Sequence, residues 1–276
     1  RWIKTIRNIF DREHISVDGK ALRRSFDGDI QSSIHMVSAW SNENNLVLAQ
    51  RKTNEKSNEI TAIPELIRTM VLENCLITID AMGCQKLIAE SIIDQKGQYL
   101  LAVKDNQPNL KKAIESTLEE VMTDVSIDSE SDFFETNEVS RNRNEIRKCW
   151  VTTDLEKLDM VDDWKNLQQI AVVESHRTIN EKTSIECRYY ICSEKLNAEE
   201  LLHASRVHWG IENKLHWVLD MGFREDESRV RKDNGAENLA RLRHIALNLL
   251  KQDTTKKMGI KNKRLTAGCD MDYLQH

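Results

Sequence analysis

The chain has 276 residues, of which 39% are hydrophobic and 31% are charged, and its formal net charge is −5. This length suits one large domain or a domain that carries an insertion, since single domains usually hold ~100 to 200 residues. No apolar run reaches the about 18 residues that a membrane-spanning helix needs, and the start carries no signal-peptide pattern. The six cysteines include no C-x-x-C pair, which indicates reduced thiols without zinc or disulfides. We therefore expect a cytoplasmic protein without a membrane partner.

The charges are unevenly distributed along the chain. Residues 112–165 hold 15 Asp and Glu against 7 Lys and Arg, a local charge of −8, whereas residues 222–266 hold 12 Lys and Arg against 6 Asp and Glu, a local charge of +6. A basic segment of this kind suits a surface that meets phosphate groups, and the net charge of the whole chain hides it. Composition alone favours the simpler interpretation, a solvated helical face.

Hydrophobic patterning predicts the order strand, strand, strand, helix, strand, helix, strand in the first part of the chain. The strands are expected at 13–19, 34–41, 46–53, 76–80 and 99–103, and the helices over 60–70, capped by Ser57 or Asn58, and around 87–92. This order is that of a ribonuclease H-like core, an α/β fold with right-handed crossovers. We predict a mixed five-stranded sheet flanked by helices.

The middle of the chain is predicted to form a β-rich insertion. A helix running to about 123 is followed by an acidic linker and then by strand patterns at 132–139, 145–153, 168–175 and 185–193. Helical patterns resume at about 197. The expected organisation is a first core part over 1–123, an insertion over 124–195 outside the core sheet, C-terminal core helices over 196–252 and a basic tail over 253–276.

Three carboxylates stand out by their positions. Asp18 and Asp80 are each expected to end a strand, and Glu212 is expected on a helix that Asn197 caps. A carboxylate at the tip of a buried strand is costly unless it holds a cation or a charged partner. Three of them can bind two Mg²⁺ ions, and the chemistry that such ions support is phosphodiester cleavage and transfer.

The helix around Glu212 carries one apolar stripe, formed by Ala204, Val207, Ile211, Leu215 and Val218. Glu212 lies at the edge of this stripe, with a histidine four residues away on either side. A lone glutamate on such a helix is more often solvated, and the predicted order of the fold is what favours a functional role. The two histidines could be read as a zinc site, but their spacing is not H-E-x-x-H, and packed or solvated histidines are the simpler interpretation.

Four motifs together resemble one enzyme family. They are Asp18-Gly-Lys20, Ile79-Asp80-Ala81, Val103-Lys-Asp-Asn106-Gln107-Pro108 and His208-Trp-Gly-Ile-Glu212-Asn-Lys-Leu-His216-Trp217. In these motifs the chain resembles the DDE transposases of cut-and-paste bacterial insertion sequences, and most closely the H-repeat-associated transposases. The resemblance runs from about residue 10 to 252. It implies a ribonuclease H-like catalytic core with a β insertion before the glutamate helix.

The resemblance also implies the site and its partners. Asp18, Asp80 and Glu212 take the positions of the catalytic, metal-binding triad, with two Mg²⁺ or Mn²⁺ ions as cofactor. DNA is the expected partner, at the element ends and at the target, with a homodimer during synapsis, nucleoid association when bound and no small-molecule substrate. The tyrosine, arginine and lysine that often surround the glutamate are replaced here by Ser205, His208 and Leu219. Only 17 residues precede Asp18, so we expect an N-terminally truncated chain.

Several basic and amide side chains are candidates for DNA contacts. They are Lys20, Arg23, Arg24, Lys104, Asn106, Gln107, Arg206, Lys214, Arg229, Arg231, Arg241 and Arg243. The function expected is metal-dependent DNA strand cleavage and strand transfer in transposition. Two alternatives stay open at this point: a ribonuclease H-like nuclease that cuts without joining, and a truncated DNA-binding remnant without activity.

Overall fold

The computed structural model of the chain describes residues 6–8, 10–27, 30–53, 59–123, 130–140 and 142–275. It divides into two compact units. The first unit comprises Arg1–Met70 and Trp209–His276, and the second comprises Val71–His208. Both ends of the chain therefore build the first unit, and the middle of the chain builds the second.

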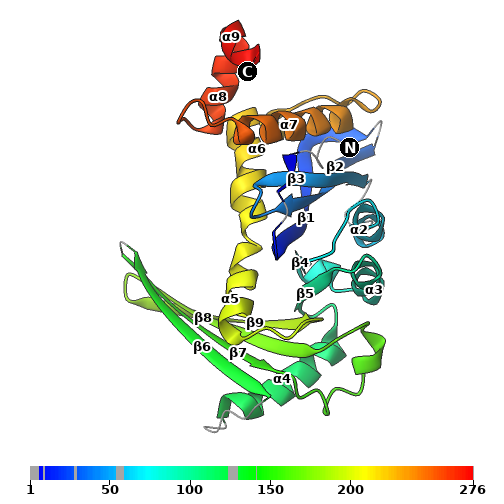
Figure 1. Cartoon of the computed structure of the whole chain (residues 1–276), viewed down its shortest axis with the longest axis vertical. Coiled ribbons are helices and arrows are strands. Elements are labelled where there is room, and N and C mark those ends of the chain that lie inside the picture. The colour runs from blue at the N-terminus through cyan, green and yellow to red at the C-terminus, as the bar shows by residue number, and fades with distance from the viewer. Residues whose placement is uncertain are drawn as a thin grey trace. The chain divides into compact units, whose positions relative to one another are not determined.

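The first unit contains an antiparallel sheet of strands β1 (Glu13–Asp27), β2 (Ile30–Ser41) and β3 (Leu46–Thr53), drawn in blue in Figure 1. A short polar turn joins β2 to β3. Asn45 in this turn has a φ of 52°, in the left-handed region that asparagine adopts more readily than most residues. The turn keeps β2 and β3 in register from Ser41 opposite Leu46 to His35 opposite Thr53, with one irregularity.

Helical elements complete the first unit. They are α2 (Glu59–Ile67), the π-helical turn η4 (Glu212–His216), α6 (Trp217–Phe223), the 3₁₀ turn η5 (Glu225–Glu227), α7 (Gly235–Gln252), α8 (Ile260–Cys269) and α9 (Met271–Gln275). One buried apolar cluster joins Trp40 and Val47 of the sheet to Ile211, Leu215, Leu219 and Leu247. Burial of these side chains holds η4, α6 and α7 against the strands.

The second unit begins with two parallel strands, β4 (Cys75–Ile79) and β5 (Gln98–Val103). The 3₁₀ turn η2 (Ala81–Gly83) and helix α3 (Lys86–Asp94) connect them, and α4 (Pro108–Thr123) follows β5. All five residues of β4 are buried, as expected for a strand covered on both faces.

Four long strands continue the sheet of the second unit. They are β6 (Ser131–Ser140), β7 (Arg143–Thr152), β8 (Gln169–Ile179) and β9 (Lys182–Cys192), with the 3₁₀ turn η3 (Val161–Asp163) between β7 and β8. The strand content predicted for this region is confirmed. The prediction that these strands lie outside the core sheet is wrong, because β9 pairs antiparallel with β5 from Leu100 opposite Cys192 to Val103 opposite Tyr189. The insertion therefore extends the sheet that β4 and β5 begin.

Helices α4 and α5 (Ala198–Val207) lie on opposite faces of this extended sheet (Figure 1). Asn197 caps α5 as predicted, and it forms a capping box with Glu200 in which each side chain accepts a hydrogen bond from the other's backbone N–H. Leu201 and Leu202 of α5 join the buried cluster on the face that carries Cys149. The acidic linker falls largely outside the described residues.

Two predicted boundaries differ from the structure. The first strand was expected to end near residue 19, but β1 continues to Asp27 because Lys20 and the residues after it pair with Met36 and its neighbours on β2. Asp18 therefore lies within a strand and not at its end. The basic tail over 253–276 contains two helices, α8 and α9. The cap predicted at Ser57 or Asn58 lies outside the described residues.

Gly210, just before the π-helical turn, lies against the turn that joins β2 and β3. A Cβ atom at this position would collide with the Oδ1 atom of Asn42. Asn42 is itself buried, and its amide donates to the Ser16 hydroxyl at 2.9 Å and to the His14 carbonyl at 3.2 Å. The close approach of the two segments thus requires glycine.

We predict that Gly210→Ala destabilises the protein by about 1 to 3 kcal/mol, because the added methyl group overpacks a buried contact. Gly268→Ala is the matched control, since no atom lies within 4 Å of its added carbon. The control should be neutral or stabilising by roughly 0.5 to 1 kcal/mol, because alanine favours a helix over glycine. Urea unfolding followed by circular dichroism measures both free energies. Equal stability of Gly210→Ala and the parent would contradict the prediction.

Candidate functional site

Asp18 is held by the pairing of β1 with β2, where it lies opposite Ser38. The following residue, Gly19, has no side chain, and a Cβ atom there would collide with the carboxylate of Glu59. Glycine at this position therefore lets buried Glu59 pack beside the strand. The Asp18 side chain is 18% exposed, so it keeps access to solvent from a largely buried strand.

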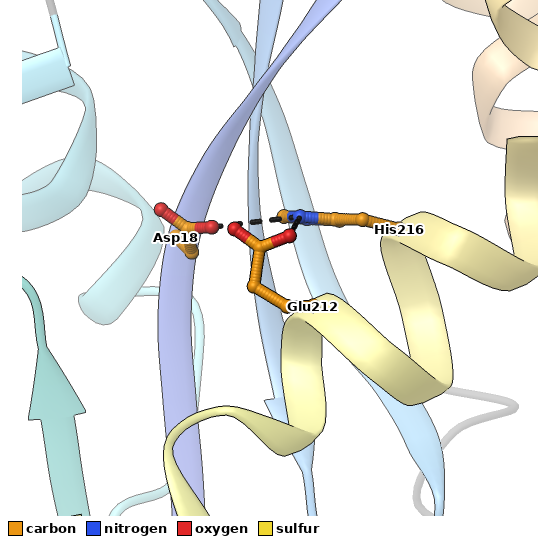
Figure 2. Close-up of side chains that lie close together, drawn as sticks. All are labelled: Asp18, Glu212 and His216. Atoms are coloured by element: carbon orange, nitrogen blue, oxygen red, sulfur yellow. Dashed lines mark ion pairs between the residues drawn. The ribbon is translucent and has the colours of Figure 1, made fainter. Parts of the chain in front are cut away.

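Glu212 and His216 are the first and last residues of the π-helical turn η4. The backbone N–H of Trp217 donates to the carbonyl oxygen of Glu212, five residues back instead of the usual four. π-helical turns are rare in proteins overall, and those that occur are often found at functional sites. Leu215 is fully buried and anchors the turn, while Glu212 and His216 point toward Asp18 (Figure 2).

One ligand atom each from Asp18, Glu212 and His216 lie within 4.8 Å of one another. The Nδ1 atom of His216 is 3.5 Å from an oxygen of Asp18 and 3.5 Å from an oxygen of Glu212 (Figure 2). The His216 side chain is only 7% exposed, whereas that of Glu212 is 50% exposed. The cluster is thus buried at the histidine and open to solvent at the glutamate.

This donor set fits a divalent cation. Ligands bound at about 2.1 Å around an octahedral ion stand roughly 3 to 4.2 Å apart. The 3.5 Å separations from His216 Nδ1 to the two carboxylates fall in that range. Two carboxylates this close repel each other, so a cation between them relieves a cost that the fold otherwise bears.

Asp80 belongs to the second unit, where it directly follows β4 as predicted. Its carboxylate caps the turn η2, accepting hydrogen bonds from the backbone N–H groups of Met82 at 3.1 Å and Gly83 at 3.4 Å through one oxygen, Oδ1. The residue is exposed. Asp80 is therefore oriented by its own loop, and its membership in a three-carboxylate site stays a prediction.

Asn106 and Gln107, predicted as DNA contacts, hold the loop that follows Asp80. The Asn106 side-chain amide donates to the Ala81 carbonyl at 2.7 Å, and that of Gln107 donates to the Cys84 carbonyl at 2.9 Å. Sequence reasoning did not find this supporting role, because it depends on the parallel alignment of β4 and β5, whose following loops then meet.

Lys20 is engaged inside the first unit. Its Nζ atom is 2.7 Å from Asp220, 3.0 Å from Asp226 and 3.3 Å from Glu225, and its side chain is 11% exposed. Arg243, also 11% exposed, lies 3.5 Å from Glu225. Burial lowers the pKa of Lys20, but the carboxylates outweigh it and raise the pKa above its ordinary value. Both cations are therefore engaged in ion pairs inside the first unit.

The remaining candidate DNA contacts are exposed, and several have partners within their own unit. Arg206 is bonded to Glu138 at 2.6 and 3.1 Å, and the Nε atom of Arg231 donates to the backbone carbonyl of Arg24 at 3.0 Å. The other exposed candidates are Arg23, Lys104, Lys214, Arg229 and Arg241, of which Arg23 pairs with Asp226 and Arg241 with Glu237. The proposal that this protein contacts DNA phosphates therefore rests on the exposed candidate side chains.

Comparison with protein families shows which family the chain belongs to. Residues 9–249 match the family described as "Transposase DDE domain". The chain belongs to the DDE transposase family. The resemblance seen in the four sequence motifs is thereby confirmed, and so is the expected class of enzyme.

Named relatives agree with this assignment. This DDE transposase is 46% identical over 279 residues to "Putative transposase YncI" of Escherichia coli O157:H7, covering 99% of this chain and 71% of that protein. It is 42% identical over 283 residues to "H repeat-associated putative transposase YhhI" of Escherichia coli K12, covering 99% of this chain and 73% of that protein.

The fold also has a relative of known structure. The transposase resembles piggyBac transposase, seen by cryo-EM in its synaptic complex with hairpin DNA, with a TM-score of 0.50 and 11% sequence identity. The match covers 95% of this chain and 53% of the piggyBac chain, so this chain spans about half of that protein. The predicted α/β, ribonuclease H-like fold is confirmed by this likeness. Among the described residues, no helix is long and apolar enough to cross a membrane.

A second histidine lies in the interior of the transposase's first unit. His244 on α7 is 4% exposed, and its Nδ1 atom is hydrogen-bonded to the side chain of Gln50 on β3. Burial lowers the pKa of His244 to about 3, and the charges of His216, Lys20 and Arg243 act in the same direction. His244 therefore stays neutral in the folded protein at all but strongly acidic pH.

We predict an acid-dependent loss of stability that depends on His244. An unfolded histidine has a pKa of about 6.5, so between about pH 6.5 and 3 the unfolded chain binds a proton that the folded protein does not. The free energy of unfolding should therefore decrease as the pH falls through this window, by up to about 1.4 kcal/mol per pH unit from this one group. Urea titrations between pH 4 and 7 measure the slope. His244→Gln should flatten it, and an unchanged slope in that variant would contradict the prediction.

Proposed function

We propose that this chain is the catalytic part of a DNA transposase that cuts DNA at the ends of a mobile element and joins the freed 3′-hydroxyl to target DNA. The observation that carries the proposal is the convergence of Asp18 and Glu212, which are distant in the sequence, within 4.8 Å of each other in a DDE transposase domain. Two carboxylates at a solvent-open position are the protein groups that metal-assisted phosphoryl transfer needs.

In this proposal Asp18, Asp80 and Glu212 form the DDE triad and hold two divalent ions, Mg²⁺ or Mn²⁺. Such ions supply an activated water or 3′-hydroxyl and stabilise the leaving oxygen of the phosphodiester. Support for Asp80 comes from its motif, its place directly after β4 and its exposure. The η2 amides engage its Oδ1 atom, which orients the carboxylate.

The protein's own contribution is to fix the carboxylates before the substrate arrives. The ladder with β2 holds Asp18, and the buried apolar side of η4 holds Glu212. Lys20 lies two residues after Asp18 on the same strand, and its ion pairs connect β1 to α6 and η5. A preorganised site of this kind lowers the entropy cost of reaching the transition state.

DNA is the proposed partner, bound through the exposed basic side chains. The transposase would act in the cytoplasm on nucleoid DNA, as a homodimer when two element ends are brought together. A nuclease that cuts without joining remains the second candidate, since its carboxylates would be the same. Transfer of pre-cut ends into a target distinguishes the two.

We predict that Asp80→Asn lowers Mg²⁺- or Mn²⁺-dependent nicking and strand transfer by orders of magnitude while DNA binding persists, because the amide keeps the shape but loses the charge that holds a cation. Asp18→Asn and Glu212→Gln should do the same, and a double variant should lose little more than a single one. Lys86→Ala, an exposed cation outside the site, is the control.

Labelled duplexes with element ends, and pre-cut ends with a free 3′-hydroxyl, measure the two steps separately. Joining by Asp80→Asn at the parent's rate would refute the triad. Nicking by the parent without joining would favour the nuclease. Neither reaction in the parent, with binding intact, would favour an inactive DNA-binding remnant.

We predict that DNA affinity falls steeply with salt, because contacts to phosphates release counterions. Arg229→Ala should reduce the slope of log K against log[salt] by about 0.9, the value for one phosphate contact. Lys86→Ala should leave the slope unchanged. Fluorescence anisotropy at several salt concentrations measures both, and an affinity that does not respond to salt would exclude the basic surface as the binding site.

A further inference from the structure

His216 is a member of the carboxylate cluster that the DDE triad does not include. Its Nδ1 atom faces both Asp18 and Glu212 at 3.5 Å, and the side chain is 7% exposed (Figure 2). Its other ring nitrogen, Nε2, is buried and has no hydrogen-bond partner within the described part of the chain. The ring therefore directs its one engaged nitrogen into the cluster.

Two other histidines of the chain place their Nδ1 atoms on neutral side chains. The chain offers two comparisons. His208, four residues before Glu212, has its Nδ1 atom 2.9 Å from the Thr78 hydroxyl, and His244 is hydrogen-bonded to Gln50. In His216, Nδ1 instead lies 3.5 Å from each of two carboxylates, which is an arrangement that a bound ion explains.

The local backbone supports the same reading. The π-helical turn begins at Glu212 and ends at His216, so the two residues that face Asp18 are the two ends of the irregular turn. A π-helical turn departs from the regular hydrogen-bond pattern of an α-helix and is frequent at functional sites. Here it presents a carboxylate and an imidazole from one segment to a carboxylate on β1.

We propose that His216 is a third protein ligand of the cation held by Asp18 and Glu212, and that its nitrogen makes this position prefer Mn²⁺ over Mg²⁺. This rests on the proposed function, because it assumes that Asp18 and Glu212 hold a cation. Mg²⁺ is a hard ion that prefers oxygen ligands and retains its waters. Imidazole nitrogen suits transition metals better, so replacing one oxygen donor by nitrogen shifts the selectivity toward Mn²⁺.

The direct test uses the whole chain with Mn²⁺ and no DNA. Electron spin-echo envelope modulation of bound Mn²⁺ detects a coordinated nitrogen, and labelling the protein with ¹⁵N-histidine identifies it as histidine. The parent should show histidine coupling. Asp18→Asn should lose most Mn²⁺ binding, which places the signal at this cluster.

The matched variants are His216→Asn, which offers an oxygen donor in place of the nitrogen, and His208→Asn, which changes a histidine four residues from Glu212 on its other side. His216→Asn should lose the nitrogen coupling. Its ratio of Mg²⁺ to Mn²⁺ dissociation constants, measured by calorimetry, should fall on the order of 10-fold, because an oxygen donor favours Mn²⁺ less than a nitrogen donor does. His208→Asn should keep both values of the parent. Circular dichroism checks the fold of each variant.

Absence of histidine coupling in the parent overturns the inference, whether or not the variants fold. Coupling that survives in His216→Asn overturns it as well. If Mn²⁺ binding depends on Asp18 but shows no nitrogen coupling, the cation site stands and the role of His216 fails. If nicking and joining are absent while coupling is present, the proposed function fails and the ligand assignment stands.

Discussion

The close approach of Asp18 and Glu212 is the constraint that the first unit has to satisfy. Two charges within 4.8 Å repel by on the order of a few kcal/mol at the effective dielectric of a partly exposed protein site. The fold keeps them together because each is anchored by other interactions, Asp18 by a strand ladder and Glu212 by a helical turn packed through its apolar side. Burial of the apolar core and strand pairing therefore hold the two carboxylates in an arrangement that favours a bound cation.

The ion pairs around Lys20 keep this negative region compact. A buried carboxylate such as Glu225 is costly without a cation, and burial raises its pKa, while Lys20 and Arg243 lower it. The same Lys20 lies on β1 two residues from Asp18. The strand that carries one catalytic candidate is thus connected by charge to α6 and η5, which follow the turn that carries the other.

In the second unit, the sheet and its loops position Asp80. Its long strands β6–β9 extend from β5, so the insertion and the strand that precedes Asp80 belong to one sheet. Asp80 is oriented by backbone amides of η2, and the amides of Asn106 and Gln107 support the same loop. The direction of the Asp80 carboxylate is therefore determined locally, by groups in the segments that follow β4 and β5.

Local sequence determined the identity and order of most elements. The strand at 46–53, the cap at Asn197 and the strand content of the insertion were predicted because short-range hydrophobic period and capping chemistry decide them. The motifs around Asp18, Asp80 and Glu212 were sufficient to identify the family. The triad itself, and the exposed basic side chains as DNA contacts, stay predictions.

Tertiary structure decided what depends on long-range contacts. The apolar stripe predicted over Ile211, Leu215 and Val218 continues at Leu219, because the π-helical turn inserts one residue that no local propensity indicates. Lys20 was predicted from sequence as a phosphate contact, but the fold places three carboxylates around it. The pairing of β9 with β5 likewise depends on residues that are far apart in the sequence. His216 was interpreted from sequence as packed or solvated, since spacing alone places it near Glu212 but not beside Asp18. Only the packing of η4 against β1 brings the imidazole of His216 beside Asp18, because these two residues are far apart in the sequence.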